Sequence, residues 1–129
     1  GVDVTIIRPF HVYGEGEAQY RLWPLLKEAA ISGNDFPMTQ GEQVRDFTPV
    51  DEIVQNILDL LAAEIIEGRC QIKNWGTGQP KKLLQFCEEW WAHWKATGKL
   101  RVGEIPYRSN EVMRFVPAVN RNIETSRHP

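Results

Sequence analysis

Residues 2–7 read Val2-Asp3-Val4-Thr5-Ile6-Ile7, and residues 70–75 read Cys70-Gln71-Ile72-Lys73-Asn74-Trp75. The first stretch is β-branched and apolar with a single charge, which is typical of a strand in a mainly buried sheet. The second is a short strand candidate that a Gly-Thr-Gly turn closes. Because helical patterns lie between them, the two strands are predicted to run parallel, joined by a right-handed helical crossover.

The helical patterns are defined by apolar spacing and by turn residues. Leu22, Leu25, Leu26, Ala29 and Ala30 form the stripe of a first helix, which ends near Gly33. A turn-rich stretch covers residues 34–41. The second helix is predicted from a capping pattern with Thr48 as N-cap and Pro49 as first helical residue, and it stops by Gly68.

Beyond the second strand, Pro80 opens a third helix that closes at Gly98, and Leu100 to Ile105 form a final strand. Residues 118–129 are predicted to be an irregular tail. Strand, helix, helix, strand, helix, strand is an α/β order with parallel strands. Its core is thin, so the chain is expected to be part of a larger domain.

Composition excludes several classes of function. The 129 residues carry 42% hydrophobic and 25% charged residues, which is typical of one globular domain. The net charge of −2 gives no electrostatic footprint for nucleic acid, and no apolar run approaches the roughly 20 residues of a membrane span. Cys70 and Cys87 lack metal-ligand spacing, so we expect a cytoplasmic protein in which both thiols behave as small apolar residues.

The chain offers no convincing catalytic or metal site. No tyrosine is followed four residues later by lysine, and the histidines are too scattered for a familiar metal site. Gly14-Glu15-Gly16 and Gly76-Thr77-Gly78 begin like dinucleotide loops but lack the third glycine, so they are interpreted as plain turns.

Two arginine-centred segments lie beside turns. Arg45 precedes the capped helix, and Arg108 follows the last predicted strand. A guanidinium in such a loop can present two charge-assisted hydrogen bonds to phosphate oxygens. The alternative is that each arginine is solvated or pairs with a nearby carboxylate. The pattern alone favours this alternative.

Five segments in order resemble the extended short-chain dehydrogenase/reductase family, the NAD(P)-dependent sugar-nucleotide epimerases, dehydratases and 4-keto reductases. The resemblance covers residues 1 to about 117. Each segment alone is weak, and their order makes the resemblance specific and favours a functional role for both arginines. The segments are residues 8–14 (RPFHVYG), 21–24 (RLWP), 45–52 (RDFTPVDE), 74–78 (NWGTG) and 108–111 (RSNE).

The resemblance implies a role for each matching residue. His11 and Arg21 stand where the family more often has asparagine, which leaves their contacts less defined. For His11 the alternative of a satisfied structural histidine stays equally open. The implied roles are the nicotinamide side of the cofactor for Pro9, Phe10 and His11, the sugar phosphate for His11, the nucleotide for Arg21 and Leu22, the base pocket for Phe36 and Met38, the diphosphate for Arg45 and Arg108, and the ribose for Glu111.

The resemblance also implies the chain's place in a larger enzyme. The chain would contain the last parallel strands of a Rossmann-like fold and a small C-terminal substrate-binding subdomain, and the N-terminal cofactor-binding half would be absent. NAD or NADP would bind the intact enzyme and not this chain alone. The expected partners are a nucleotide-diphosphate sugar and a second copy or the missing half. Two alternatives stay open: a non-catalytic nucleotide-sugar-binding module, and a remnant acting only through partner contacts.

Overall fold

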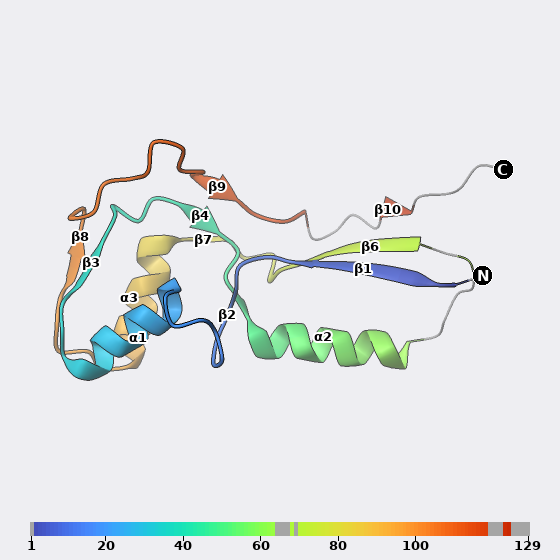
Figure 1. The fold of residues 1–129 in the computed structure, drawn as a ribbon, viewed down its shortest axis with the longest axis horizontal. Coiled ribbons are helices and arrows are strands. Elements are labelled where there is room, and N and C mark those ends of the chain that lie inside the picture. The colour runs from blue at the N-terminus through green and yellow to red at the C-terminus, as the bar shows by residue number, and fades with distance from the viewer. Residues whose placement is uncertain (1, 64–67, 69, 119–122, 125–129) are drawn as a thin grey trace.

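The computed structural model of the chain describes residues 2–63, 68, 70–118 and 123–124 (Figure 1). Three helices and two six-residue strands form its framework, and short strands connect them. The helices are α1 (Leu22–Ser32), α2 (Val50–Ala62) and α3 (Leu83–His93). The strands are β1 (Val4–Pro9), β2 (Val12–Tyr13), β3 (Phe36–Met38), β4 (Val44–Arg45), β5 (Thr48–Pro49), β6 (Cys70–Trp75), β7 (Lys81–Lys82), β8 (Leu100–Val102), β9 (Arg114–Phe115) and β10 (Ile123–Glu124).

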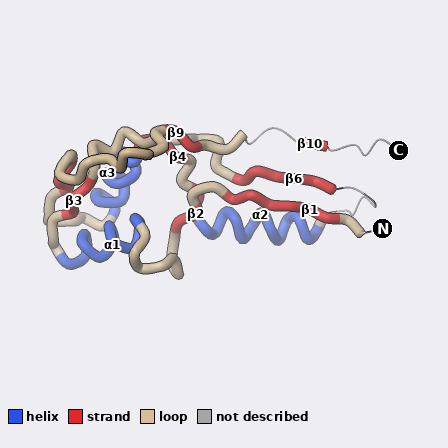
Figure 2. Tube along the Cα trace, turned by 45° about the horizontal axis from the view of Figure 1, so that its top comes forward, coloured by secondary structure: helices blue, strands red, loops and turns tan. Residues whose placement is uncertain are grey.

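The predicted pair of parallel strands is confirmed. β1 and β6 pair in parallel from Val4 opposite Cys70 to Pro9 opposite Trp75, so both carboxyl ends meet at one edge. β10 adds to the far side of β6 in antiparallel register, inside the stretch predicted to be irregular. Helix α2 runs alongside this sheet in both views of the chain (Figures 1 and 2). The result is the mixed α/β fold with parallel strands that the sequence predicts.

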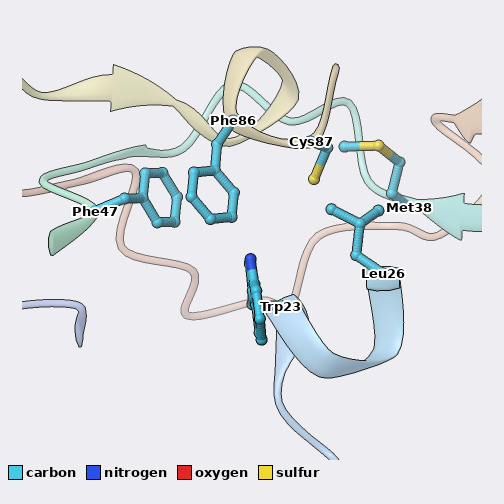
Figure 3. Close-up of a cluster of buried hydrophobic side chains, with 6 residues drawn as sticks. All are labelled: Trp23, Leu26, Met38, Phe47, Phe86 and Cys87. Atoms are coloured by element: carbon cyan, nitrogen blue, oxygen red, sulfur yellow. The ribbon is translucent and has the colours of Figure 1, made fainter. Parts of the chain in front are cut away.

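The other end of the molecule holds α1, α3 and the parallel pair of β3 and β8 (Figure 1). Its core lies where α1 and α3 meet β3 (Figure 3). Trp90, Trp91 and Trp94 of the α3 region pack against this core, as the helical spacing of these aromatic residues predicts. The buried apolar residues at its centre are Trp23, Leu26, Met38, Phe47, Phe86 and Cys87.

Helix α1 follows the prediction, and α2 begins differently. Gly33 ends α1 in the left-handed conformation, at φ 71°. For α2 the predicted cap is wrong, because Pro49 is the N-cap and no side chain caps the helix. The Thr48 hydroxyl instead donates to the Asp46 carbonyl, and Thr48 pairs with Val12 between β5 and β2. Tertiary pairing therefore displaces the local cap.

Three further boundaries differ from the prediction. The turn-rich stretch 34–41 contains β3, whose pairing with β8 the local composition does not reveal. The third helix begins at Leu83, because residues 81–82 pair with β4. It ends at His93, with Trp94 as its C-cap, before the expected Gly98.

The two cysteines have different environments. Cys87 lies in the core as predicted, but Cys70 is exposed at the start of β6, so its predicted apolar role is wrong. No helix in the described part of the chain combines the length and apolarity that crossing a membrane requires.

Candidate functional site

A cavity of about 560 Å³ opens between the segment after β1, the start of α1, strand β4 and the loop after β8. Segments far apart in the sequence contribute its charged side chains, so only the folded chain assembles it. Six of the predicted site residues line this one cavity: His11, Arg21, Leu22, Arg45, Arg108 and Glu111.

Arg45 is held in place by the loop opposite it. Only 9% of this residue is exposed. Its Nη1 donates to the Val44 carbonyl at 2.9 Å, and its Nη2 donates to the Val112 carbonyl at 2.6 Å and to Glu111 Oε1 at 3.4 Å. These three bonds use three of the five guanidinium donors, so two remain for a ligand. The alternative in which Arg45 pairs with a carboxylate is therefore realised, within the cavity.

The loop after β8 forms one wall of the cavity and carries the second arginine. Tyr107 Oη accepts a hydrogen bond from the Glu42 amide at 3.0 Å, and the Val44 amide donates to the Met113 carbonyl at 2.7 Å. Between Tyr107 and Met113 the Glu111 amide donates to the Arg108 carbonyl at 3.1 Å, which closes a turn. Arg108 is exposed and makes no ion pair with any described residue. It brings an uncompensated positive charge to the cavity.

A second ion pair lies at the start of α1. Arg21 Nε donates to Glu17 Oε1 at 3.3 Å, and both residues line the cavity. The lining therefore holds three arginines and two carboxylates, of which Glu17 pairs with Arg21 and Glu111 pairs with Arg45. The surplus charge is positive and belongs to Arg108. A cavity of this kind favours an anionic ligand.

His11 lines the cavity and has an unusual backbone conformation, with φ 42°. Its ring stacks on the Phe47 ring, with centroids 5.5 Å apart and planes 28° apart. Burial, followed by the positive charges of Arg45 and Arg21, lowers the pKa of His11 below its ordinary value of 6.5, and Asp46 opposes this shift. The imidazole is thus biased toward its neutral form.

The turn after β6 is held by the residue next to Arg45. Asp46 is 1% exposed, and its carboxylate accepts hydrogen bonds from the Thr77 amide, the Thr77 hydroxyl and the Gly78 amide at 2.9, 2.5 and 2.9 Å. The amides of a Gly-x-Gly turn can bind a phosphate, but here the protein's own carboxylate occupies them. Residues 76–78 are therefore the plain turn that the sequence predicts.

Aromatic residues that the sequence did not single out complete the cavity. Phe47 stacks on Phe86, with ring centroids 3.9 Å apart, and Tyr13 meets Phe86 edge to face at 4.9 Å. Tyr20 also lines the cavity, and it is largely exposed. Position alone could have flagged Phe47 and Tyr13, because each lies within two residues of a predicted site residue.

Four predicted site residues lie outside the cavity. Met38 is in the core, and Phe36 is a neighbour of Trp91, with ring centroids 6.5 Å apart. Pro9 ends β1 at the surface, and Phe10 donates its amide to the Trp75 carbonyl at 3.0 Å. The roles of Phe36 and Met38 toward a base stay predictions.

The ends of β1 and β6 fit the position that a dinucleotide takes in parallel sheets. Such ligands bind beyond the carboxyl ends of the strands. Pro9, Phe10 and the 76–78 turn lie at that edge, next to the half-buried His11. The roles of Pro9, Phe10 and His11 toward a nicotinamide cofactor stay predictions. Among the described residues, no cluster of three or more histidine, cysteine or acidic side chains could hold a metal ion.

Comparison with known proteins identifies the family. Residues 1–76 match the NAD dependent epimerase/dehydratase family. The chain belongs to this family.

Individual relatives agree with this assignment. CDP-abequose synthase of Salmonella muenchen is 27% identical over 113 residues, which are 86% of this chain and 38% of that protein. The NAD-dependent NDP-hexosamine 5,6-dehydratase TunA is 29% identical, with a TM-score of 0.68, over 87% of this chain and 35% of its own. UDP-N-acetylglucosamine 4-epimerase of Methanobrevibacter ruminantium shares the fold at 16% identity, with a TM-score of 0.74, over 90% of this chain and 37% of its own. The chain thus spans between 35% and 38% of the length of these three relatives.

Proposed function

We propose that this chain is the nucleotide-sugar-binding part of an NAD(P)-dependent sugar-nucleotide epimerase, dehydratase or reductase. In this proposal Arg45 and Arg108 hold the diphosphate, and Glu111 lies beside the ribose. The single observation that carries it is the shared cavity, in which both arginines and Glu111 meet. Its volume of about 560 Å³ lies within the 300–1,000 Å³ of ordinary ligand sites.

The charge of the cavity supports a diphosphate as the bound group. A diphosphate diester carries two negative charges on neighbouring phosphates, and two guanidinium groups can each give it paired hydrogen bonds. Arg45 is rigid because it is buried and bonded to the opposite loop, whereas Arg108 is exposed and can follow the ligand. A fixed and a mobile donor together would orient the sugar, and such positioning lowers the barrier of a reaction between bound components.

The cofactor and the chemistry belong to the whole enzyme in this proposal. Solved relatives include MoeE5 in complex with UDP-glucose and NAD, which shares the fold. Within this sequence no tyrosine has a lysine four residues later, so the catalytic pair would lie in a preceding half. The 129 residues alone would then bind without turnover, and Pro9, Phe10 and His11 would meet the cofactor only in the intact protein.

A titration tests this function. CDP-glucose, UDP-glucose and dTDP-glucose are each titrated into the protein that carries this chain, and at least one is expected to bind. Arg108→Ala should weaken that binding at least tenfold, because a charge-assisted hydrogen bond contributes about 1.5–3 kcal/mol and about 1.4 kcal/mol is a factor of ten.

The matched control is Arg114→Ala. Arg114 is an exposed arginine in β9 that does not line the cavity, so its removal changes net charge equally and should leave affinity unchanged. No binding of any of the three nucleotide sugars would refute the proposed function. Equal affinity of wild-type protein and the Arg108→Ala variant would refute the diphosphate role of Arg108.

A further inference from the structure

We propose that His11 takes up one proton when the diphosphate enters the cavity, so that its imidazolium becomes a third cationic contact to the ligand. This inference rests on the proposed function and adds a charge-switching residue to the same site. The geometry that carries it is the position of His11 in the cavity with Arg45 and Arg21, and the fixed orientation of its ring on Phe47.

The ring of His11 is free to contact a ligand. Its nitrogens make no hydrogen bond with any described residue, and they are not among the buried polar atoms that lack a partner. The His11 carbonyl accepts the Thr48 amide at 3.1 Å next to the β2–β5 pair, and the His11 ring stacks on Phe47. A stacked ring with reachable nitrogens is suited to one defined contact.

The surroundings explain why the imidazole changes charge. In the free cavity burial, and after it the two neighbouring guanidinium groups of Arg45 and Arg21, oppose its protonation. A diphosphate brings two negative charges, which compensate the arginines and favour the imidazolium. One proton therefore passes from solvent to the ring, and the charge of the ring rises from neutral to +1 as the ligand binds.

The other ionisable groups around His11 do not replace it in this role. Glu17 and Glu111 each form an ion pair with an arginine, and the Asp46 carboxylate is occupied by the 76–78 turn. Burial raises the pKa of Tyr13 above its ordinary value of 10.0, so that phenol stays neutral. The remaining charged or titratable groups of the cavity are Tyr20, Arg21, Arg45 and Arg108. Histidine alone ordinarily titrates between about pH 5 and 8.

The sign of the pH dependence follows from the two states of the ring. Below the pKa of the free state the ring is charged before binding, and above the pKa of the bound state it is neutral throughout. Between these two pKa values binding consumes a proton, so the dissociation constant rises with pH by up to about tenfold per pH unit. The free-state pKa lies below 6.5, so this window extends upward from there.

Calorimetry of the protein that carries this chain tests the inference. UDP-glucose and CDP-glucose are titrated between pH 5 and 8 in two buffers of different ionisation enthalpy, which reports protons taken up per ligand. Both are diphosphate diesters, so they lack the terminal phosphate of a nucleoside diphosphate, whose pKa near 6 would confuse the result. Wild-type protein is expected to take up a substantial fraction of one proton near neutral pH.

Two variants assign the proton to one residue. His11→Asn keeps a polar side chain that tolerates positive φ, and it should bind without the His11 proton. His93→Asn removes an exposed histidine of α3 outside this cavity and should behave like wild type. Uptake that persists in His11→Asn, or binding by wild type without uptake, overturns the inference and leaves the proposed function standing. If neither these two nucleotide sugars nor dTDP-glucose binds, both proposals are overturned.

Discussion

Arg45 Nη2 donates to the carbonyl of Val112 at 2.6 Å, which joins strand β4 to the loop that closes the cavity. One residue thus lines the cavity and also fixes its wall. We predict that Arg45→Ala raises the dissociation constant of the nucleotide sugar more than tenfold and also increases hydrogen exchange of residues 104–113. Arg108→Ala should raise the dissociation constant without changing the exchange. Unchanged nucleotide-sugar binding by Arg45→Ala contradicts the diphosphate clamp.

A second prediction concerns the turn after β6. Asp46→Ala leaves the Thr77 and Gly78 amides without their acceptor, so the free energy of unfolding in urea should fall by about 3 kcal/mol. Asp46→Asn should cost less, because its side-chain oxygen still accepts one bond. Asp59→Ala is the control, since Asp59 is exposed and, among the residues that the structure describes, bonds only Gln55 on the same helix. If Asp46→Ala lowers the free energy of unfolding no more than Asp59→Ala does, the Asp46 carboxylate does not hold the turn.

The third prediction separates backbone strain from lack of space. Gly41 has φ 69°, and a Cβ there would lie 2.6 Å from Leu84 Cβ and 2.8 Å from the Leu84 amide nitrogen. Gly41→Ala should therefore lower the free energy of unfolding by about 3 kcal/mol. Gly16 has φ 87° with nothing within 4 Å, so Gly16→Ala should cost only about 1 kcal/mol of strain. Equal losses in urea denaturation would mean that α3 moves aside at Leu84.

The fourth prediction distinguishes the two thiols. Burial, with a smaller effect of Glu88, raises the pKa of Cys87 to about 12, so this thiol carries almost no thiolate at pH 8. Cys70 is exposed. A thiol reagent at pH 8 should label the folded chain at Cys70 only and should reach Cys87 after denaturation, where a free thiol has a pKa near 8.5. Rapid labelling of Cys87 in the folded protein would place it outside a closed core.

Hydrophobic periodicity predicted the long elements, and tertiary pairing decided the rest. β1, α1 and α2 carry apolar patterns, β6 was predicted from the Gly-Thr-Gly turn that follows it, and all four elements form. β1 is mostly exposed, so the expectation of a mainly buried strand is wrong for this chain. The two-residue strands β2, β4, β5, β7, β9 and β10 are too short for a period, so only their partners define them. Thr48 shows the same effect at a helix start, because its strand pairing with Val12 replaced a cap that looked adequate locally.

For the site, the family pattern indicated which residues meet but not how they are held. Arg45 and Arg108 were expected beside the same ligand, and they line one cavity. The bonds from Arg45 to Val112 and Glu111 span more than 60 residues of sequence, and no local pattern encodes such a partner. For Met38 the family match indicates a base-pocket position, but it does not indicate that the side chain packs in the core.

The fifth prediction follows from the apolar stripe of α2. Val54, Ile57, Leu58 and Leu61 lie on one helical stripe and are 49%, 39%, 54% and 77% exposed. Beside them, β1 has no strand partner on its outer edge among the described residues. We expect the remainder of a longer enzyme to cover this surface, so the 129-residue chain alone should self-associate in light scattering.

The double substitution Leu58→Lys and Leu61→Lys tests this expectation, because it removes apolar surface and keeps good helix formers. The monomer fraction of the 129-residue chain should rise at equal concentration. Gln55→Lys is the control, since Gln55 lies on the exposed polar side of α2 and its replacement adds a positive charge, one where the double variant adds two, without removing apolar surface. If the wild-type chain is already a monodisperse monomer, the stripe needs no partner and the expected covering half loses its main physical support.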